Sequence, residues 1–123
     1  MFRLFFVFLL VMTTGAKAQT LSFEGMWTGF STDDAIEIWV NIVGNNHVRA
    51  EIALKSTKTD EMITHNSEGT RHIDIMVSTL SRGIDAFDFY KISENEILMR
   101  GRWKGEAFDA VLLPPATAPP PWF

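Results

Sequence analysis

The sequence predicts an all-β protein in which about eight short antiparallel strands form an up-and-down barrel. Between Gly25 and Leu113, apolar residues recur at every second position, which places them on one face of a sheet. Turn-forming residues interrupt this alternation at short, regular intervals, and connections this short imply antiparallel neighbours. No stretch has an apolar stripe of helical period and length. The eight strands are predicted at about 25–32, 35–43, 47–56, 60–66, 71–80, 84–92, 96–103 and 106–113.

Three of these segments show the alternation most clearly, and each is predicted to have one buried and one solvent-facing side. Their buried residues are Ile36, Ile38, Val40 and Ile42, then Val48, Ala50, Ile52 and Leu54, then Ile73, Ile75 and Val77. Trp39 does not fit the pattern, because it lies between Ile38 and Val40 and so faces away from the isoleucine stripe. Either Trp39 covers a patch on the outside of the barrel, or the faces are reversed at this point.

The predicted turns consist of Gly, Asn, Asp and Ser, which accept positive φ angles or bond their own backbone. They are placed at Thr32-Asp33-Asp34, Gly44-Asn45-Asn46, Thr57-Lys58-Thr59-Asp60, Ser67-Glu68-Gly69, Ser81-Arg82-Gly83, Ser93-Glu94-Asn95 and Lys104-Gly105. The fourth strand, 60–66, has the weakest pattern and depends on the turn that begins at Ser67.

Three segments are predicted along the chain. Residues 1–18 have the features of a secretory signal peptide, with Arg3, an apolar run over 4–12 and Ala16-Lys17-Ala18 as a cleavage site. Residues 19–113 form the β-domain, and residues 114–123 form a Pro-rich tail. The apolar run is shorter than a membrane-spanning helix. We therefore expect export to the periplasm or the cell exterior, and not an integral membrane protein.

All five prolines lie in the tail, where they prevent continuation of a strand ladder and favour an extended conformation. Three alternatives follow for residues 114–123. The tail is a disordered end, a spacer, or a strap whose Trp122 and Phe123 dock on the barrel.

The charge balance argues against nucleic acid as a partner. The chain has 11 Lys and Arg against 15 Asp and Glu, and removal of Arg3 and Lys17 makes the balance more acidic. Binding to phosphate requires clustered basic residues. The nearest approach to a cluster, 100–104, has acidic residues on both sides. The chain has no cysteine, so its stability depends on packing and backbone pairing.

The sequence contains no recognised catalytic motif. It has no Gly-x-Ser-x-Gly elbow and no thiol nucleophile. His47, His65 and His72 have no spacing typical of metal ligands. Asp85 and Asp88 flank an aromatic stretch, but a catalytic pair needs two carboxylates in one desolvated site. We expect no enzymatic activity, no metal and no cofactor.

One motif occurs twice. Gly25-Met26-Trp27-Thr28-Gly29 in the first predicted strand returns as Gly101-Arg102-Trp103-Lys104-Gly105 near the end of the seventh. A large aromatic ring beside glycines that allow close backbone approach can close the end of a small barrel. The residues predicted to close the barrel are Gly25, Trp27, Gly101, Arg102 and Trp103.

The position of the first Gly-x-Trp, shortly after the signal peptide, resembles that in lipocalin-like, or calycin, barrels, including short domains of bacterial exported proteins. The resemblance implies that Trp27 packs across the closed end and that Arg100 or Arg102 lies over it. This chain is shorter than a full lipocalin and lacks the family's Thr-Asp-Tyr type motif and flanking helix. A barrel of this size is either filled by its own side chains or holds one small ligand.

Two functions remain open. The first is a carrier or sensor of a small apolar ligand, with a pocket wall predicted to consist of Trp27, Ile52, Phe87, Phe89, Met99 and Trp103. The second is a protein-binding module, such as an inhibitor or accessory domain of a secreted enzyme, that has a filled core and uses its acidic surface and its tail.

Overall fold

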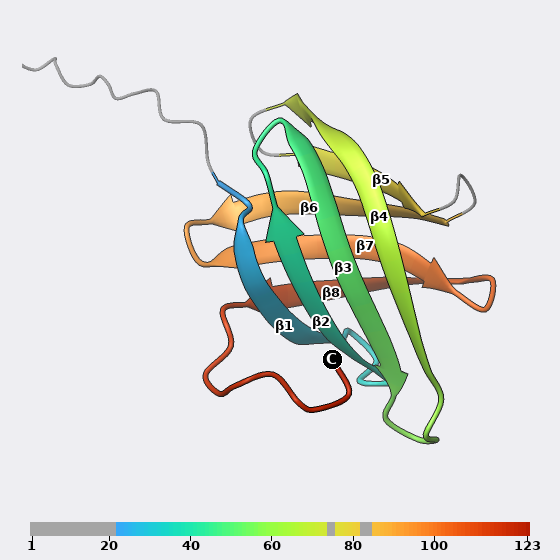
Figure 1. Ribbon diagram of the computed structural model, residues 1–123. Coiled ribbons are helices and arrows are strands. Elements are labelled where there is room, and N and C mark those ends of the chain that lie inside the picture. The colour runs from blue at the N-terminus through green and yellow to red at the C-terminus, as the bar shows by residue number, and fades with distance from the viewer. Residues whose placement is uncertain (1–21, 74–75, 82–84) are drawn as a thin grey trace, which may run out of the picture.

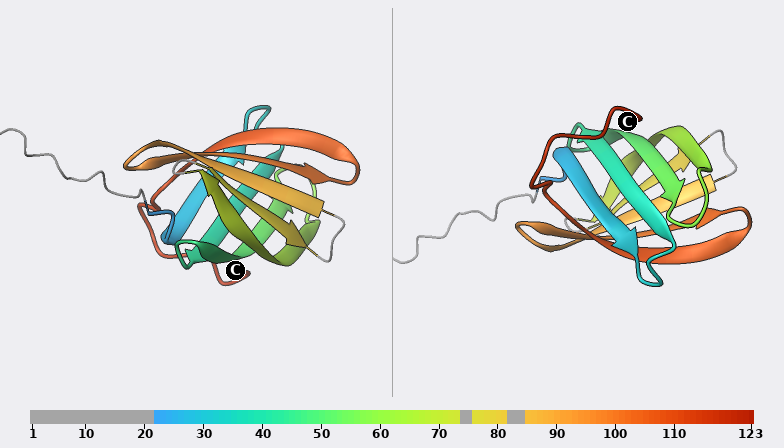
Figure 2. Two further views of the ribbon diagram at one scale, coloured as in Figure 1. Left: turned by 90° about the horizontal axis from the view of Figure 1, so that it is seen from above. Right: turned by 90° about the horizontal axis from the view of Figure 1, so that it is seen from below.

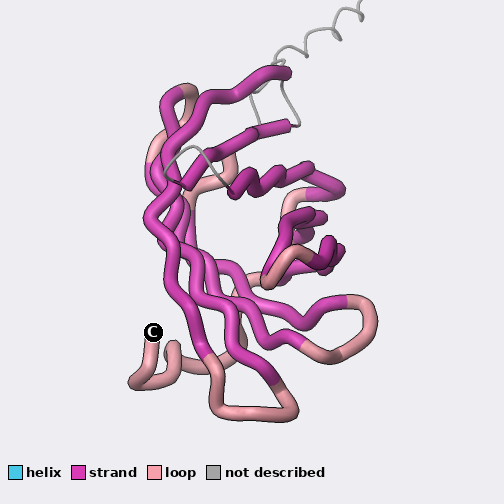
Figure 3. The backbone as a smooth tube through the Cα atoms, turned by 90° about the vertical axis from the view of Figure 1, so that its right-hand side faces the viewer, coloured by secondary structure: helices cyan, strands magenta, loops and turns pink. Residues whose placement is uncertain are grey.

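The structure is a computed structural model that describes residues 22–73, 76–81 and 85–123, and the regular structure in these residues is β-strand (Figures 1 and 3). The predicted signal peptide, 1–18, lies outside the described residues. The described part contains no helix with the length and hydrophobicity needed to cross a bilayer. The strands are β1 (Gly25–Ser31), β2 (Ile36–Val43), β3 (His47–Ser56), β4 (Met62–Ile73), β5 (Met76–Ser81), β6 (Asp85–Ser93), β7 (Glu96–Trp103) and β8 (Glu106–Leu113).

The eight strands form a closed up-and-down barrel, which confirms the predicted fold class. Each strand pairs antiparallel with the next, and β8 pairs with β1 through four residue pairs from Thr28–Leu113 to Ser31–Ala110. Figure 2 shows the strands following one another around the barrel in chain order. Closure gives the first and last strands a partner, which is one way in which β-proteins avoid free sheet edges.

Because successive strands run in opposite directions, the connections alternate between the two ends of the barrel. One end holds the start of β1, the turns β2–β3 and β6–β7, the end of β4 and the start of β5; we call it the Trp27 end. The other holds the turns β1–β2, β3–β4 and β7–β8, the end of β5 and the start of β6; we call it the Trp103 end. The two Gly-x-Trp motifs therefore lie at opposite ends of the barrel.

The barrel interior is packed with apolar side chains. The predicted stripes on β2 and β3 point inward as expected: Ile38, Val40 and Ile42 are buried, as are Val48, Ala50, Ile52 and Leu54. Phe87 and Phe89 from β6, Ile97 and Met99 from β7, and Ala110 and Leu112 from β8 complete the same cluster. The middle of the barrel is a core, held by contacts between side chains from most of its strands.

Two motif glycines provide space for close packing. A Cβ atom on Gly29 would lie 2.3 Å from the backbone oxygen of Val111, so the closing pair β1–β8 requires glycine at this position. A Cβ atom on Gly101 would lie 2.6 Å from the ring of Phe87. The first glycine allows a backbone to approach and the second allows an aromatic ring to enter the core.

The structure corrects the predicted boundary between the fourth and fifth strands. Ser67-Glu68-Gly69 is not a turn, because β4 continues through it to Ile73 and pairs with β3 as far as His47. Ser67 lies opposite Ala50 and is buried, and Gly69 lies opposite Val48. The long pairing with β3 outweighs the local turn preference of Ser and Gly. The strand predicted at 71–80 is divided between β4 and β5, with 74–75 outside the described residues.

The Pro-rich tail folds back onto the barrel, in agreement with the strap among the three alternatives (Figures 1 and 2). The ring of Phe123 lies 6.2 Å from that of Trp39, measured between centroids, on the outside of β2. Trp39 faces outward, as its place between Ile38 and Val40 indicates, yet it is only 6% exposed. Its Nε1 donates a hydrogen bond to Glu37. Trp39 thus covers an outer patch and is itself covered by the end of the chain.

Candidate functional site

At the Trp27 end, the first Gly-x-Trp motif forms a closed plug. Trp27 is 4% exposed, and its Nε1 donates a 2.9 Å hydrogen bond to the carbonyl of Phe23, which is fully buried. The ammonium of Lys91 on β6 lies 4.6 Å from the centre of the Trp27 ring and donates to the carbonyl of Ser22. Arg71 lies over the Phe23 ring on the same end. Cation–π contacts of this kind fix the plug in place.

The basic residue over Trp27 is therefore Lys91, and the expectation of Arg100 or Arg102 is wrong. Both arginines are on β7 and face outward. Arg100 pairs with Asp109 at 3.2 Å, and Arg102 donates to the carbonyl of Gly105. The β6 strand places alternate residues Phe87, Phe89 and Lys91 inward, so Lys91 reaches the plug from inside the wall. The alternation of β6 could have indicated Lys91 from the sequence.

Burial also affects the charge of Lys91. The residue is only 8% exposed, and desolvation lowers its pKa from the usual 10.5, while the charge of Glu94 opposes this shift. When the pH is between the lowered pKa and 10.5, the unfolded chain binds more protons than the folded chain. Stability therefore increases as the pH rises through this window. At lower pH the cost of burying the charge is fully present.

The matched variant Lys91→Met removes this titration while keeping an unbranched side chain of similar length. We expect the free energy of unfolding of the parent protein to rise, relative to that of Lys91→Met, as the pH increases from neutrality toward 10.5. Urea unfolding of both proteins across this range measures the difference. If the free energy of unfolding of the parent protein minus that of Lys91→Met stays constant or falls as the pH rises, the burial cost assigned to Lys91 is contradicted.

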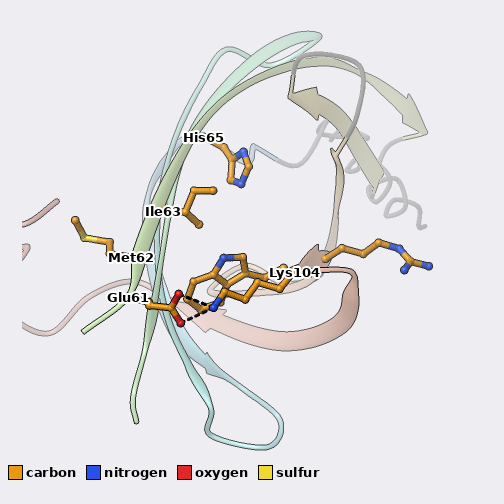
Figure 4. A pocket seen from close by; sticks show the side chains of 7 residues that line it. Glu61, Met62, Ile63, His65 and Lys104 are labelled. Atoms are coloured by element: carbon orange, nitrogen blue, oxygen red, sulfur yellow. Dashed lines mark hydrogen bonds and ion pairs between the residues drawn. The ribbon is translucent and has the colours of Figure 1, made fainter. Parts of the chain in front are cut away.

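At the Trp103 end the second motif borders a cleft of about 470 Å³, which we call the β4–β7 cleft. It is lined by Glu61, Met62, Ile63, His65, Arg102, Trp103 and Lys104. Figure 4 shows Ile63 and His65 pointing from β4 toward the space of the cleft, while Met62 points to the other side of the strand. This cleft is the candidate functional site.

The cleft arises from the unequal lengths of the strands. β4 pairs with β3 from Met62 to Thr70, but β5 pairs with β4 only from Glu68 to Ile73. Among the described residues, the first half of β4 therefore has a strand partner on one side alone. The next described wall on its open side is the end of β7, which contributes Arg102 and Trp103.

An ion pair bridges this opening. The Lys104 ammonium pairs with the Glu61 carboxylate, which joins the β7–β8 turn to the residue before β4, 43 positions away in the chain (Figure 4). Lys104 and Gly105 have φ angles of 56° and 80°, as in the tight hairpin turn that needs two positive values. The ammonium also lies 5.8 Å from the centre of the Trp103 ring. The pair and the ring thus form one face of the cleft.

His65 forms the inner part of the cleft. It lies on the inward face of β4, opposite Ile52, and is partly buried. Its ring is 5.0 Å from that of Phe87, measured between centroids, and tilted by 56°. Phe87 in turn fills the space left by Gly101. His65 therefore separates the cleft from the core.

The six residues predicted to line a ligand pocket are divided between core and clefts. Ile52, Phe87, Phe89 and Met99 are fully buried in the core cluster. Trp103 lines the β4–β7 cleft, and Trp27 lines a second cleft of about 510 Å³ at the opposite end, beside Lys91 and Pro114. Among the residues predicted to close the barrel, Gly25 has a φ of 130° and starts β1, while Arg102 lies outside near the turn.

Sequence reasoning missed Glu61, Ile63 and Lys104 as site residues. Glu61 lies in the predicted strand with the weakest pattern, and Lys104 lies in a predicted turn. Their contact depends on how the barrel brings two distant turns to the same end, which no local pattern indicates. No spacing in the sequence marks His65 as a site residue, whereas the structure places it on the inner face of β4 beside Phe87. The side chains of His72 and Asp85 lie outside the described set.

Comparison with known proteins gives no assignment of family or function. No model of a protein family matches the chain, and no curated protein matches its sequence.

Proposed function

We propose that this is an exported, non-catalytic, lipocalin-like binding protein that takes one small, mainly apolar ligand in the β4–β7 cleft. The observation that carries the proposal is the cleft itself. Its volume of about 470 Å³ lies in the range of small-molecule sites, and Trp103 and Ile63 give it an apolar wall. A few polar groups at one side, of the kind that orient ligands, accompany this wall.

The packing of the barrel supports this location over the barrel centre. A ligand among Phe87, Phe89 and Met99 would have to displace fully buried side chains, each of which contributes to the core. Removing such contacts costs several kcal/mol, roughly 3–5 for a phenylalanine. A ligand in the β4–β7 cleft needs no such displacement, because the opening beside β4 is already present.

Titration with the neutral fluorescent probe N-phenyl-1-naphthylamine tests the proposal. We expect saturable binding with a rise in probe fluorescence and quenching of tryptophan emission. Trp103→Ala should weaken the affinity by about tenfold or more, as expected for an aromatic residue central to a site.

Phe30→Ala is the matched control, because Phe30 is 51% exposed on the outside of β1, away from the cleft. It should leave the affinity unchanged. Full affinity in Trp103→Ala, or no binding by the parent protein, would overturn the proposal. The protein-binding module would then be the remaining hypothesis, with the exposed outer row of Phe30 and its cross-strand partner Val111 as the first surface to examine.

A further inference from the structure

We propose that the β4–β7 cleft selects ligands that carry one anionic group on an apolar body, and that this anion replaces Glu61 as the partner of Lys104. The inference rests on the proposed function and names the class of ligand. It follows from the charges in the cleft, from the weakness of the ion pair that crosses it, and from the position of the ammonium next to an aromatic ring.

The charges around the cleft differ from those of the whole protein. The chain has a formal net charge of −4, yet the described lining of the cleft has a single carboxylate, Glu61, against two cations, Lys104 and Arg102. Of these, Arg102 faces outward and donates to the carbonyl of Gly105, which leaves Lys104 as the cation available to a ligand. Asp33 and Glu106 line an adjoining cleft, which shares Glu61, Trp103 and Lys104 with the first. An anionic group therefore meets fewer carboxylates in the β4–β7 cleft than in the adjoining one.

The ion pair between Lys104 and Glu61 can be exchanged at low cost. Both side chains are more than half exposed, and exposed ion pairs contribute only about 0–1 kcal/mol to stability. A ligand that is held by apolar contacts brings its anion to the lysine at high local concentration. Glu61 then has free access to solvent, so its charge does not become buried without a partner.

The placement of the ammonium favours an amphipathic ligand. The Lys104 nitrogen lies 5.8 Å from the centre of the Trp103 ring, and Ile63 faces the same space from β4. An apolar or aromatic body on Trp103 and Ile63 would hold its anionic group within reach of the lysine. Aryl or alkyl carboxylates and sulfonates have this shape and charge.

Two probes with the same aromatic scaffold separate charge from shape. N-phenyl-1-naphthylamine is neutral, and 8-anilinonaphthalene-1-sulfonate is the same molecule with a sulfonate. We expect the sulfonate to bind the parent protein more tightly than the neutral probe. Lys104→Gln should weaken sulfonate binding by about tenfold, the loss expected for one charged hydrogen bond. Glu61→Gln should strengthen it, because the competing carboxylate is removed. Both variants should change the affinity for the neutral probe much less than that for the sulfonate, because the neutral probe has no charge to pair with Lys104 or to be repelled by Glu61.

Charge-matched controls lie on the outer face of β3. Arg49→Gln removes one positive charge, as Lys104→Gln does, and Glu51→Gln removes one negative charge, as Glu61→Gln does. Neither residue lines the β4–β7 cleft, and both variants should leave the affinity for the two probes unchanged. Far-UV circular dichroism and thermal melting show whether each variant is folded. The preference for the sulfonate in the parent protein should also decrease with added salt.

The outcomes distinguish the two proposals. If both probes bind and Trp103→Ala weakens both, but Lys104→Gln leaves sulfonate binding intact, the proposed function stands and the anion selectivity is wrong. If Lys104→Gln weakens both probes equally, the lysine only shapes the cleft and the selectivity is again wrong. If neither probe responds to Trp103→Ala, the proposed function itself fails.

Discussion

Replacement of Phe87 by alanine is expected to lower the free energy of unfolding by about 3–5 kcal/mol. The ring is fully buried, packs against the ring of His65 and occupies the space that Gly101 leaves open. Its carbonyl accepts a hydrogen bond from the buried hydroxyl of Thr79 on β5. Removal of the ring leaves a cavity between β4, β6 and β7. The strands around it cannot move inward enough to fill it, because each is held by its paired neighbours.

Urea unfolding followed by tryptophan fluorescence measures this loss. Ile92→Ala is the matched control on the same strand, because Ile92 faces outward and is 54% exposed, and its effect should stay within about 0.5 kcal/mol. A loss below about 1 kcal/mol for Phe87→Ala would show that the interior is loosely packed, and would favour a ligand cavity in the barrel centre.

Replacement of Gly29 by alanine is expected to lower the free energy of unfolding by about 2–3 kcal/mol and to weaken the closure of the barrel. The added methyl group would stand 2.3 Å from the backbone oxygen of Val111, which cannot move without separating β8 from β1. The closing contact has only four residue pairs, so few other interactions offset its loss.

Hydrogen exchange locates the effect of Gly29→Ala. We expect amides of the β1–β8 ladder to exchange faster than in the parent protein. Amides between β2 and β3 should lose no more protection than the fall in the global free energy of unfolding accounts for. Phe30→Ala, at the adjacent outward position, is the control and should leave the ladder protected. Unchanged protection in Gly29→Ala would contradict the role assigned to this glycine in closing the barrel.

Much of the fold could be predicted because it depends on local patterns. The alternation in β2 and β3 determined which side chains face inward, and short turns such as Lys104-Gly105 determined antiparallel neighbours. The boundary between β4 and β5 could not be predicted in this way. Ser67 and Gly69 have local turn preferences, but pairing with β3 keeps them in a strand, and that pairing is not a local property.

The candidate site was predictable only in part. The repeated Gly-x-Trp motif indicated Trp27 and Trp103 as residues at the ends of the barrel, and the structure places one at each end. The partners of these residues come from elsewhere in the chain. Lys91 over Trp27, and Glu61 across from Lys104, are brought there by the barrel's order of strands.

The residue pattern alone specifies a chain of about eight strands, with clear alternation of apolar and polar faces in several of them, and no cysteine for covalent cross-links. These properties follow from the two-residue period of a strand and from the chemistry of single residues. Three features follow only from the tertiary structure: Trp27 plugs one end of the barrel while Trp103 borders a cleft at the other, Phe123 covers Trp39, and a short β5 leaves the β4–β7 cleft. Each of these depends on contacts between residues far apart in the chain, which are set by barrel closure and register.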